Sequence, residues 1–172
     1  MGIIATFQFS QIDLARILLA SGNVVTEAKR LVLALPKQGA IEYAGNVLAA
    51  ISSQKYGWAA HSAKYQKWKL RVGASLYKWV LSGDLLANIK PHSIMRGGIT
   101  MWFSGISSNA MSTGAFGTKS KPIVDYAYSL EYGGVKKNMP ARPLFRPEFE
   151  IYKGIWGLKI MQAKGSIRKQ WR

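Results

Sequence analysis

Few of the residue types that carry enzyme chemistry occur in this sequence. It has two histidines, His61 and His92, eight acidic residues and no cysteine. Neither histidine stands at a metal-binding spacing such as H-x3-H or H-E-x-x-H, and there is no cysteine to act as a thiolate ligand or nucleophile. Glu148 and Glu150 would point in different directions on a helix, so they would not flank one substrate bond. We therefore expect no enzymatic activity, no metal and no cofactor, and both histidines at the surface or in turns.

Positive charge is the strongest signal in the composition. The 172 residues include 24 Lys and Arg against 8 Asp and Glu, a net charge of +16 at pH 7. Such a surface attracts polyanions, which include nucleic acid, acidic membranes and acidic proteins. The apolar fraction of 48% predicts a folded core rather than intrinsic disorder. No stretch reaches the roughly 18 apolar residues of a membrane span, so we expect no membrane partner.

Residues 55–79 interleave basic and aromatic side chains and contain no acidic residue. Lys and Arg neutralise phosphates, and Trp and Tyr stack on unpaired bases, so one interpretation is contact with nucleic acid. The same aromatics also suit a protein interface or a core, and the lysines suit a solvated helix face. The candidate contacts with a partner protein or nucleic acid are Trp58, Lys64, Lys67, Trp68, Lys69 and Arg71.

Helical patterns dominate the first third of the chain. Residues 3–9 are β-branched and aromatic, which predicts a strand, and a short amphipathic helix is expected to follow. Residues 24–53 predict a long helical region, because apolar residues recur at helical spacing. Pro36 and Gly39 fall inside this region, and we expect them to break or kink it once.

A hairpin is the clearest pattern in the middle of the chain. Residues 89–95 and 99–103 read as two strands, and the glycines of Arg96-Gly97-Gly98 supply the turn. Residues 104–122 are rich in Gly, Ser and Thr, which predicts a long exposed loop that a partner could order. Residues 123–132 fit either a further strand or a short helix.

The last third predicts a C-terminal helix. Pro147 suits its first turn, and Glu148 and Glu150 suit the positive end of its dipole. Its expected apolar stripe is Ile151, Ile155, Leu158 and Met161. Together these patterns predict an α+β fold in one domain, residues 1–172, with a small, mainly antiparallel sheet packed against the long N-terminal helical region and the C-terminal helix.

Three segments resemble the motif blocks of a tailed-bacteriophage neck family, the head–tail joining or tail-completion proteins. Residues 82–89 (SGDLLANI) resemble T-G-x-L-x-x-S-I, residues 126–134 (YAYSLEYGG) resemble Y-A-x-x-V-E-Y-G-T, and residues 140–147 (PARPLFRP) resemble P-A-R-P-F-L-R-P. The third block is the most specific. Residues 54–80 and 104–122 look like insertions into the family core.

The resemblance implies a virion structural protein that forms a ring at the head–tail junction, completes or joins the tail and lets DNA pass. It implies six or twelve copies in a closed ring of head-to-tail contacts, and as partners other neck, connector and tail proteins, with passing contact with phage DNA. The protein would be made in the host cytoplasm. Acidic neighbours are the favoured target of the basic surface, because a tight grip on phosphates would hinder DNA ejection. The alternative is a basic nucleic-acid-binding protein that is not part of a virion.

The blocks also suggest an assembly motif with its own physical reading. Gly133 permits a turn that bulkier residues resist, and the prolines stiffen the segment that carries Arg142 and Arg146. We expect Glu131 to pair with one of these arginines, within the chain or between subunits; the alternative is a plain pair of surface arginines. The candidate assembly residues are Tyr126, Glu131, Tyr132, Gly133, Pro140, Arg142, Pro143, Arg146 and Pro147.

Overall fold

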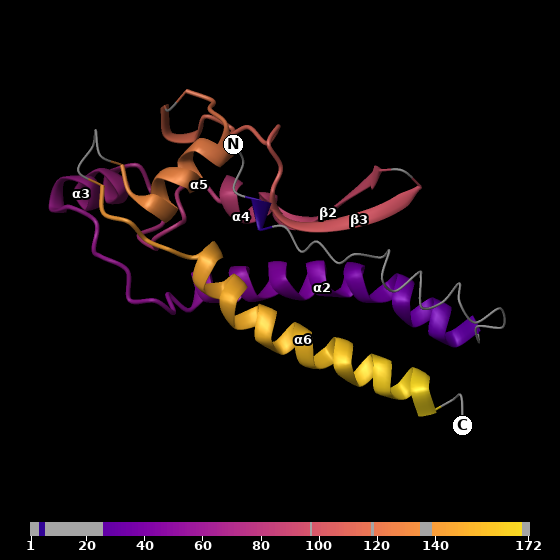
Figure 1. The fold of residues 1–172 in the computed structure, drawn as a ribbon. Helices are drawn as coiled ribbons and strands as arrows, with labels where there is room; N and C mark the ends of the chain where they lie inside the picture. Colours follow the sequence, from indigo (N-terminus) through magenta and orange to yellow (C-terminus); the bar gives the residue numbers. More distant parts are fainter. Residues whose placement is uncertain (1–3, 6–25, 97, 118, 135–138, 170–172) are drawn as a thin grey trace.

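The structure is a computed structural model that describes residues 4–5, 26–96, 98–117, 119–134 and 139–169 (Figure 1). The expected strand at 3–9 is described only at its second and third residues, and the short helix expected after it lies outside the described residues. The elements are β1 (Ile4–Ala5), α2 (Thr26–Ser52), α3 (Ala63–Arg71), α4 (Asp84–Asn88), β2 (Ile89–Arg96), β3 (Ile99–Ile106), η1 (Ala115–Gly117), α5 (Ile123–Tyr132) and α6 (Phe145–Lys169).

The predicted hairpin is confirmed. Strands β2 and β3 pair antiparallel from Ile89 opposite Ile106 to Arg96 opposite Ile99. The short β1 pairs antiparallel with the other edge of β3, so the strand order is β1-β3-β2. Figure 1 shows α2 between this hairpin on one side and α6 on the other. The predicted α+β class is therefore confirmed, with the antiparallel sheet and the C-terminal helix on opposite sides of the long N-terminal helix.

Helix α2 continues through Pro36 and Gly39, so of the break or kink expected there, the break is wrong. Proline removes one helical hydrogen bond, but Pro36 is buried and α2 is packed on two sides, which compensates for the loss. Gly39 has a packing role rather than a breaking one. A Cβ atom there would come within 2.8 Å of the Trp156 ring, so glycine lets α6 approach α2 closely.

One cluster of buried apolar side chains connects the elements. Its largest fully buried side chains are Tyr43 of α2, Trp79 of the loop before α4, and Tyr152 and Trp156 of α6. Trp58 belongs to the same cluster. The basic and aromatic segment 55–79 therefore contributes to the core as well as to the surface.

The segment expected to be a long loop awaiting a partner is instead held by contacts within the chain. Strand β3 extends to Ile106, which is buried. Beyond it, the Ser112 N–H donates to the Lys121 carbonyl at 2.9 Å. The Oδ2 atom of Asp84 accepts hydrogen bonds from the Thr113 backbone N–H and hydroxyl, at 3.0 and 2.9 Å. Of the two structures that residues 123–132 allowed, the helix is the one formed.

Helix α6 begins as expected but buries a different face. Pro147 and Glu148 lie in its first turn. Its buried face includes Tyr152 and Trp156, both of which interrupt the predicted stripe. The four residues of that stripe are between 44% and 61% exposed; they are Ile151, Ile155, Leu158 and Met161. The face of α6 that packs against α2 is therefore the one that carries the large aromatic side chains, and not the one on which aliphatic residues recur at helical spacing.

Candidate functional site

The second and third motif blocks meet where α5 ends and α6 begins, a region we call the α5–α6 junction (residues 126–134 and 139–147). Glu131 lies at its centre and is 2% exposed. One carboxylate oxygen accepts the backbone N–H groups of Leu144 and Phe145 at 2.7 and 3.1 Å. The other accepts the N–H of Arg146 at 3.1 Å. Helix N-termini leave backbone N–H groups unpaired and carry partial positive charge, so Glu131 of α5 caps α6.

The expected pairing of Glu131 with Arg142 or Arg146 is wrong within the chain. Arg142 is 3% exposed, and its Nε and Nη2 atoms donate to the carbonyls of Ala59 and Ala60 at 3.1 and 3.3 Å. Arg146 is exposed, and its guanidinium lies over the Tyr132 ring at 6.0 Å. The Glu131 carboxylate instead accepts hydrogen bonds from backbone N–H groups at the start of α6. The alternative of two surface arginines is also wrong, because Arg142 is buried.

Backbone contacts fix the rest of the α5–α6 junction. Gly134 and Met139 form a bridge with two hydrogen bonds, at 3.0 and 3.2 Å. The Arg142 N–H donates to the Leu130 carbonyl at 2.6 Å. The indole N–H groups of Trp79 and Trp58 donate to the Arg142 and Pro143 carbonyls, at 3.0 and 2.7 Å. Of the nine candidate assembly residues, Tyr132, Pro140 and Arg146 are exposed, Glu131 and Arg142 are buried, and Tyr126, Gly133, Pro143 and Pro147 lie between.

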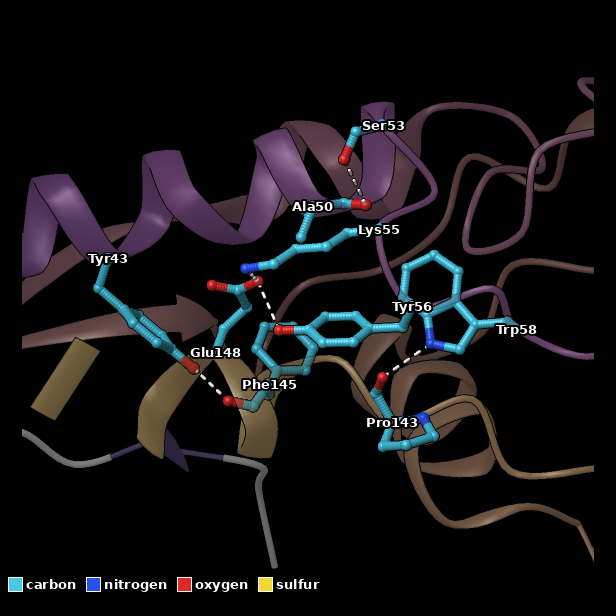
Figure 2. A network of polar contacts seen from close by, with 9 residues as sticks. All are labelled: Tyr43, Ala50, Ser53, Lys55, Tyr56, Trp58, Pro143, Phe145 and Glu148. Atoms are coloured by element: carbon cyan, nitrogen blue, oxygen red, sulfur yellow. Dashed lines mark hydrogen bonds and ion pairs between the residues drawn. The ribbon is translucent and has the colours of Figure 1, made fainter. Parts of the chain in front are cut away.

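A second set of contacts on the first turn of α6 was not predicted. Figure 2 shows Lys55 and Tyr56 converging on the buried carboxylate of Glu148, with both distances at 2.6 Å. The Tyr43 hydroxyl donates to the Phe145 carbonyl at 2.7 Å. Burial and the Glu148 carboxylate raise the pKa of Tyr56. Sequence spacing gave no signal for this cluster, because its members come from segments more than ninety residues apart.

Four of the six candidate contacts with a partner protein or nucleic acid lie on one side of α3. Ser62, Lys64, Tyr65, Lys67, Trp68 and Arg71 line an open cleft of about 580 Å³, which we call the α3 cleft. The Tyr65 and Trp68 rings stack with centroids 5.4 Å apart and planes 19° apart. Four of the six predicted contacts therefore lie together, and the structure adds Tyr65. A signal for Tyr65 was present in the sequence, because it stands three residues before Trp68 on a helix.

Comparison with models of known protein families, with curated proteins and with solved structures gave no match. The part of the chain that the structure describes holds no group of three residues able to bind a metal ion. None of its helices combines the length and the apolar character that a membrane span requires.

The other two candidate contacts, Trp58 and Lys69, lie inside the protein, so the prediction that they contact a partner is wrong; for Trp58 the core, which was the alternative, is correct. Trp58 packs in the core. Lys69 is 1% exposed, and its ammonium donates to the carbonyls of Val80 and Tyr77 at 2.6 and 3.1 Å. His61 is also buried, contrary to expectation, with Nε2 at 3.4 Å from the Lys69 ammonium. The Lys69 stem lies on the face of α3 that packs inward, so position on the helix, and not residue type, decided its burial.

Lys69 is a buried cation whose charge is held by carbonyl groups. Burial, together with the charges of Arg142 and Lys78, lowers the pKa of Lys69 to about 8. Burial and the charge of Lys69 likewise lower the pKa of His61 to about 4. The folded protein therefore binds fewer protons at these two sites than the unfolded chain does.

Lys69 is expected to add stability as the pH rises from 8 to 10. In that range the unfolded chain keeps the Lys69 proton, whose ordinary pKa is 10.5, while the folded protein releases it. Because the unfolded state binds more protons at this site, the contribution of Lys69 to the free energy of unfolding should increase by about 2 kcal/mol over this range. Buried tyrosines such as Tyr56, whose pKa is raised, contribute in the opposite direction, so the measurement is the difference between the urea unfolding of wild type and of Lys69→Met at pH 8, 9 and 10. The exposed Lys67→Met should keep the wild-type pH profile; a Lys69→Met profile that also matches the wild type would contradict the assignment.

Proposed function

We propose that this protein is a virion structural protein of the phage neck, which forms a ring at the head–tail junction, completes or joins the tail and lets DNA pass. The observation that carries the proposal is the α5–α6 junction. Two of the three blocks that resemble the neck family, residues 126–134 and 140–147, fold against each other through Glu131 and Arg142. The buried residues Glu131 and Arg142 fix the backbone of this junction. Tyr132, Pro140 and Arg146 are exposed on it, where a neighbouring subunit can contact them.

Exposed apolar side chains support assembly into a ring. The stripe of α6 (Ile151, Ile155, Leu158 and Met161) is one such surface. The β2–β3 hairpin carries exposed apolar side chains on both of its faces, with Ile94 at 54% and Met95 at 75% exposed. Contiguous exposed apolar groups are typical of protein interfaces, and a ring needs two different surfaces on each copy. Figure 1 shows α6 and the hairpin on opposite sides of α2, which suits this requirement.

The native mass in high salt, where charge-driven association is suppressed, tests the proposal. We expect a species of six or twelve times the 19.0 kDa chain mass. The double variant Ile155→Gln with Leu158→Gln should shift this species toward the monomer, because a polar group at an interface core weakens it. Lys153→Gln, on the opposite side of α6, is the matched control and should not.

A monomer at every concentration would contradict self-assembly. An unchanged mass in the double variant would contradict the role of the α6 stripe while leaving the ring in place. Thermal unfolding of each variant shows whether the fold is kept, and we expect little change because both positions are exposed.

A second candidate function is a basic nucleic-acid-binding protein that acts outside a virion. The α3 cleft favours it, because cations and stacked aromatics lie together there. This function predicts tight binding by the monomer and a log affinity that falls steeply and linearly with log salt. The neck protein predicts a defined oligomer whether or not nucleic acid is present.

A further inference from the structure

The α3 cleft combines cationic and aromatic side chains on one wall. Lys64, Lys67 and Arg71 line it, and none of its lining residues is acidic. The aromatic pair Tyr65 and Trp68 forms part of the same wall. The three cations are exposed, and no carboxylate in the described part of the chain forms an ion pair with them.

The aromatic pair is fixed from behind by the core. The Tyr65 ring meets the His61 ring edge-on at 5.0 Å, and the Lys69 ammonium lies 5.5 Å from the Tyr65 ring centroid. The Lys69 ammonium in turn donates to the carbonyls of Tyr77 and Val80, which lie on either side of Trp79. At the start of the helix, the Ser62 hydroxyl accepts the Tyr65 N–H at 3.3 Å. Binding on the exposed side therefore costs little reordering of the wall.

The spacing of the cations matches a chain of negative charges. Lys64, Lys67 and Arg71 are three and four residues apart, so they follow one face of α3. They span about 10 Å along the helix axis, which is long enough for more than one phosphate. An acidic peptide would satisfy the cations but has no use for flat aromatic faces. Single-stranded nucleic acid uses both, because its unpaired bases stack on aromatic rings while its phosphates meet Lys and Arg.

We propose that the α3 cleft binds single-stranded nucleic acid, with an unpaired base stacked on the Tyr65–Trp68 wall and phosphates on Lys64, Lys67 and Arg71. Duplex DNA keeps its bases inside and meets only the cations, so a passing duplex would not be gripped by stacking. The inference does not rest on ring formation, since every group in the cleft comes from one chain.

Fluorescence anisotropy with a labelled oligonucleotide of about ten unpaired thymidines tests this, alongside the matched duplex. The triple variant Lys64→Gln, Lys67→Gln, Arg71→Gln should weaken binding of the single strand about tenfold or more. It should also reduce the slope of log affinity against log salt by about 2, because roughly 0.7 counterions per lost phosphate contact are no longer released. The control is Lys90→Gln, Lys119→Gln, Lys164→Gln, which removes the same charge from exposed sites away from α3.

Stacking has its own readout. Trp68→Ala should weaken binding of the single strand about tenfold, Trp68→Phe should restore much of it, and neither should change the salt slope. Equal losses in the cleft triple and the control triple would overturn the proposal. So would duplex binding as tight as the single strand, or displacement of the oligonucleotide by polyglutamate at equal charge, which would assign the cleft to an acidic peptide. If Trp68→Ala fails to fold, the two charge triples still decide the site.

Discussion

Replacing Glu131 with alanine is expected to cost about 3–5 kcal/mol of stability. The substitution leaves three backbone N–H groups at the start of α6 without their acceptor, in a place that is nearly closed to water. Each buried donor left unpaired costs about 1–3 kcal/mol, and the removed side chain leaves a cavity. Urea unfolding followed by circular dichroism measures the loss.

Glu150→Ala is the matched control for this prediction. Glu150 lies in the first turns of the same helix, but its side chain is exposed, so we expect a change of no more than about 0.5 kcal/mol. Glu131→Gln should fall between the two, because the amide keeps one acceptor oxygen and loses the charge that favours the helix N-terminus. A loss for Glu131→Ala as small as for Glu150→Ala would show that the cap contributes little.

Substitution of Gly133 with alanine is expected to cost about 2–4 kcal/mol. Gly133 ends α5 with φ at +82° and ψ at 162°, a conformation that residues with a Cβ adopt only under strain. The added Cβ would also stand 2.9 Å from the Met139 carbonyl oxygen and 3.2 Å from the Ala141 nitrogen. Both neighbours are backbone atoms of the α5–α6 junction, so relief of the clash would disturb the bridge between Gly134 and Met139.

Gly154→Ala is the control for the glycine effect. Gly154 is exposed in α6, and a Cβ there meets nothing within 4 Å. Alanine is the better helix former, so this substitution should stabilise the protein by about 0.5–1 kcal/mol. Thermal unfolding of the two variants should therefore show shifts of opposite sign, and a shift of the same sign in both would contradict the strain assigned to Gly133.

The regular elements were predictable from the sequence because their signals are local. The hairpin follows from two strand-like segments on either side of Arg96-Gly97-Gly98, and α2 follows from apolar residues at helical spacing. The continuation of α2 through Pro36 was not predictable, because it depends on the hairpin and α6 packing on both sides. The buried face of α6 was missed for the same reason, since the space beside Gly39 accepts the Trp156 ring.

The candidate site was predictable in its membership but not in its chemistry. The sequence placed Glu131, Arg142 and Arg146 in one motif, and charge alone suggested that they pair. In the structure the Glu131 carboxylate instead accepts backbone N–H groups, and the Arg142 guanidinium donates to the carbonyls of Ala59 and Ala60. Backbone groups have no signal in the sequence, so their competition for a charged side chain is visible only in the fold. In the α3 cleft the residue types predicted four of the lining residues, but not the inward positions of Trp58 and Lys69 or the contribution of Tyr65.

The long separation between α2 and its partners on α6 affects how the chain is made. Glu42 and Tyr43 bond to groups 102 to 117 residues further along the sequence. A ribosome that adds about 5–20 residues per second reaches those groups roughly 5–20 s after α2 has been synthesised. The hairpin emerges earlier and covers one side of α2, while the side that packs against α6 is uncovered until α6 has been synthesised. During synthesis, the side of α2 that packs against α6 therefore stays open to solvent longer than the side that the hairpin covers.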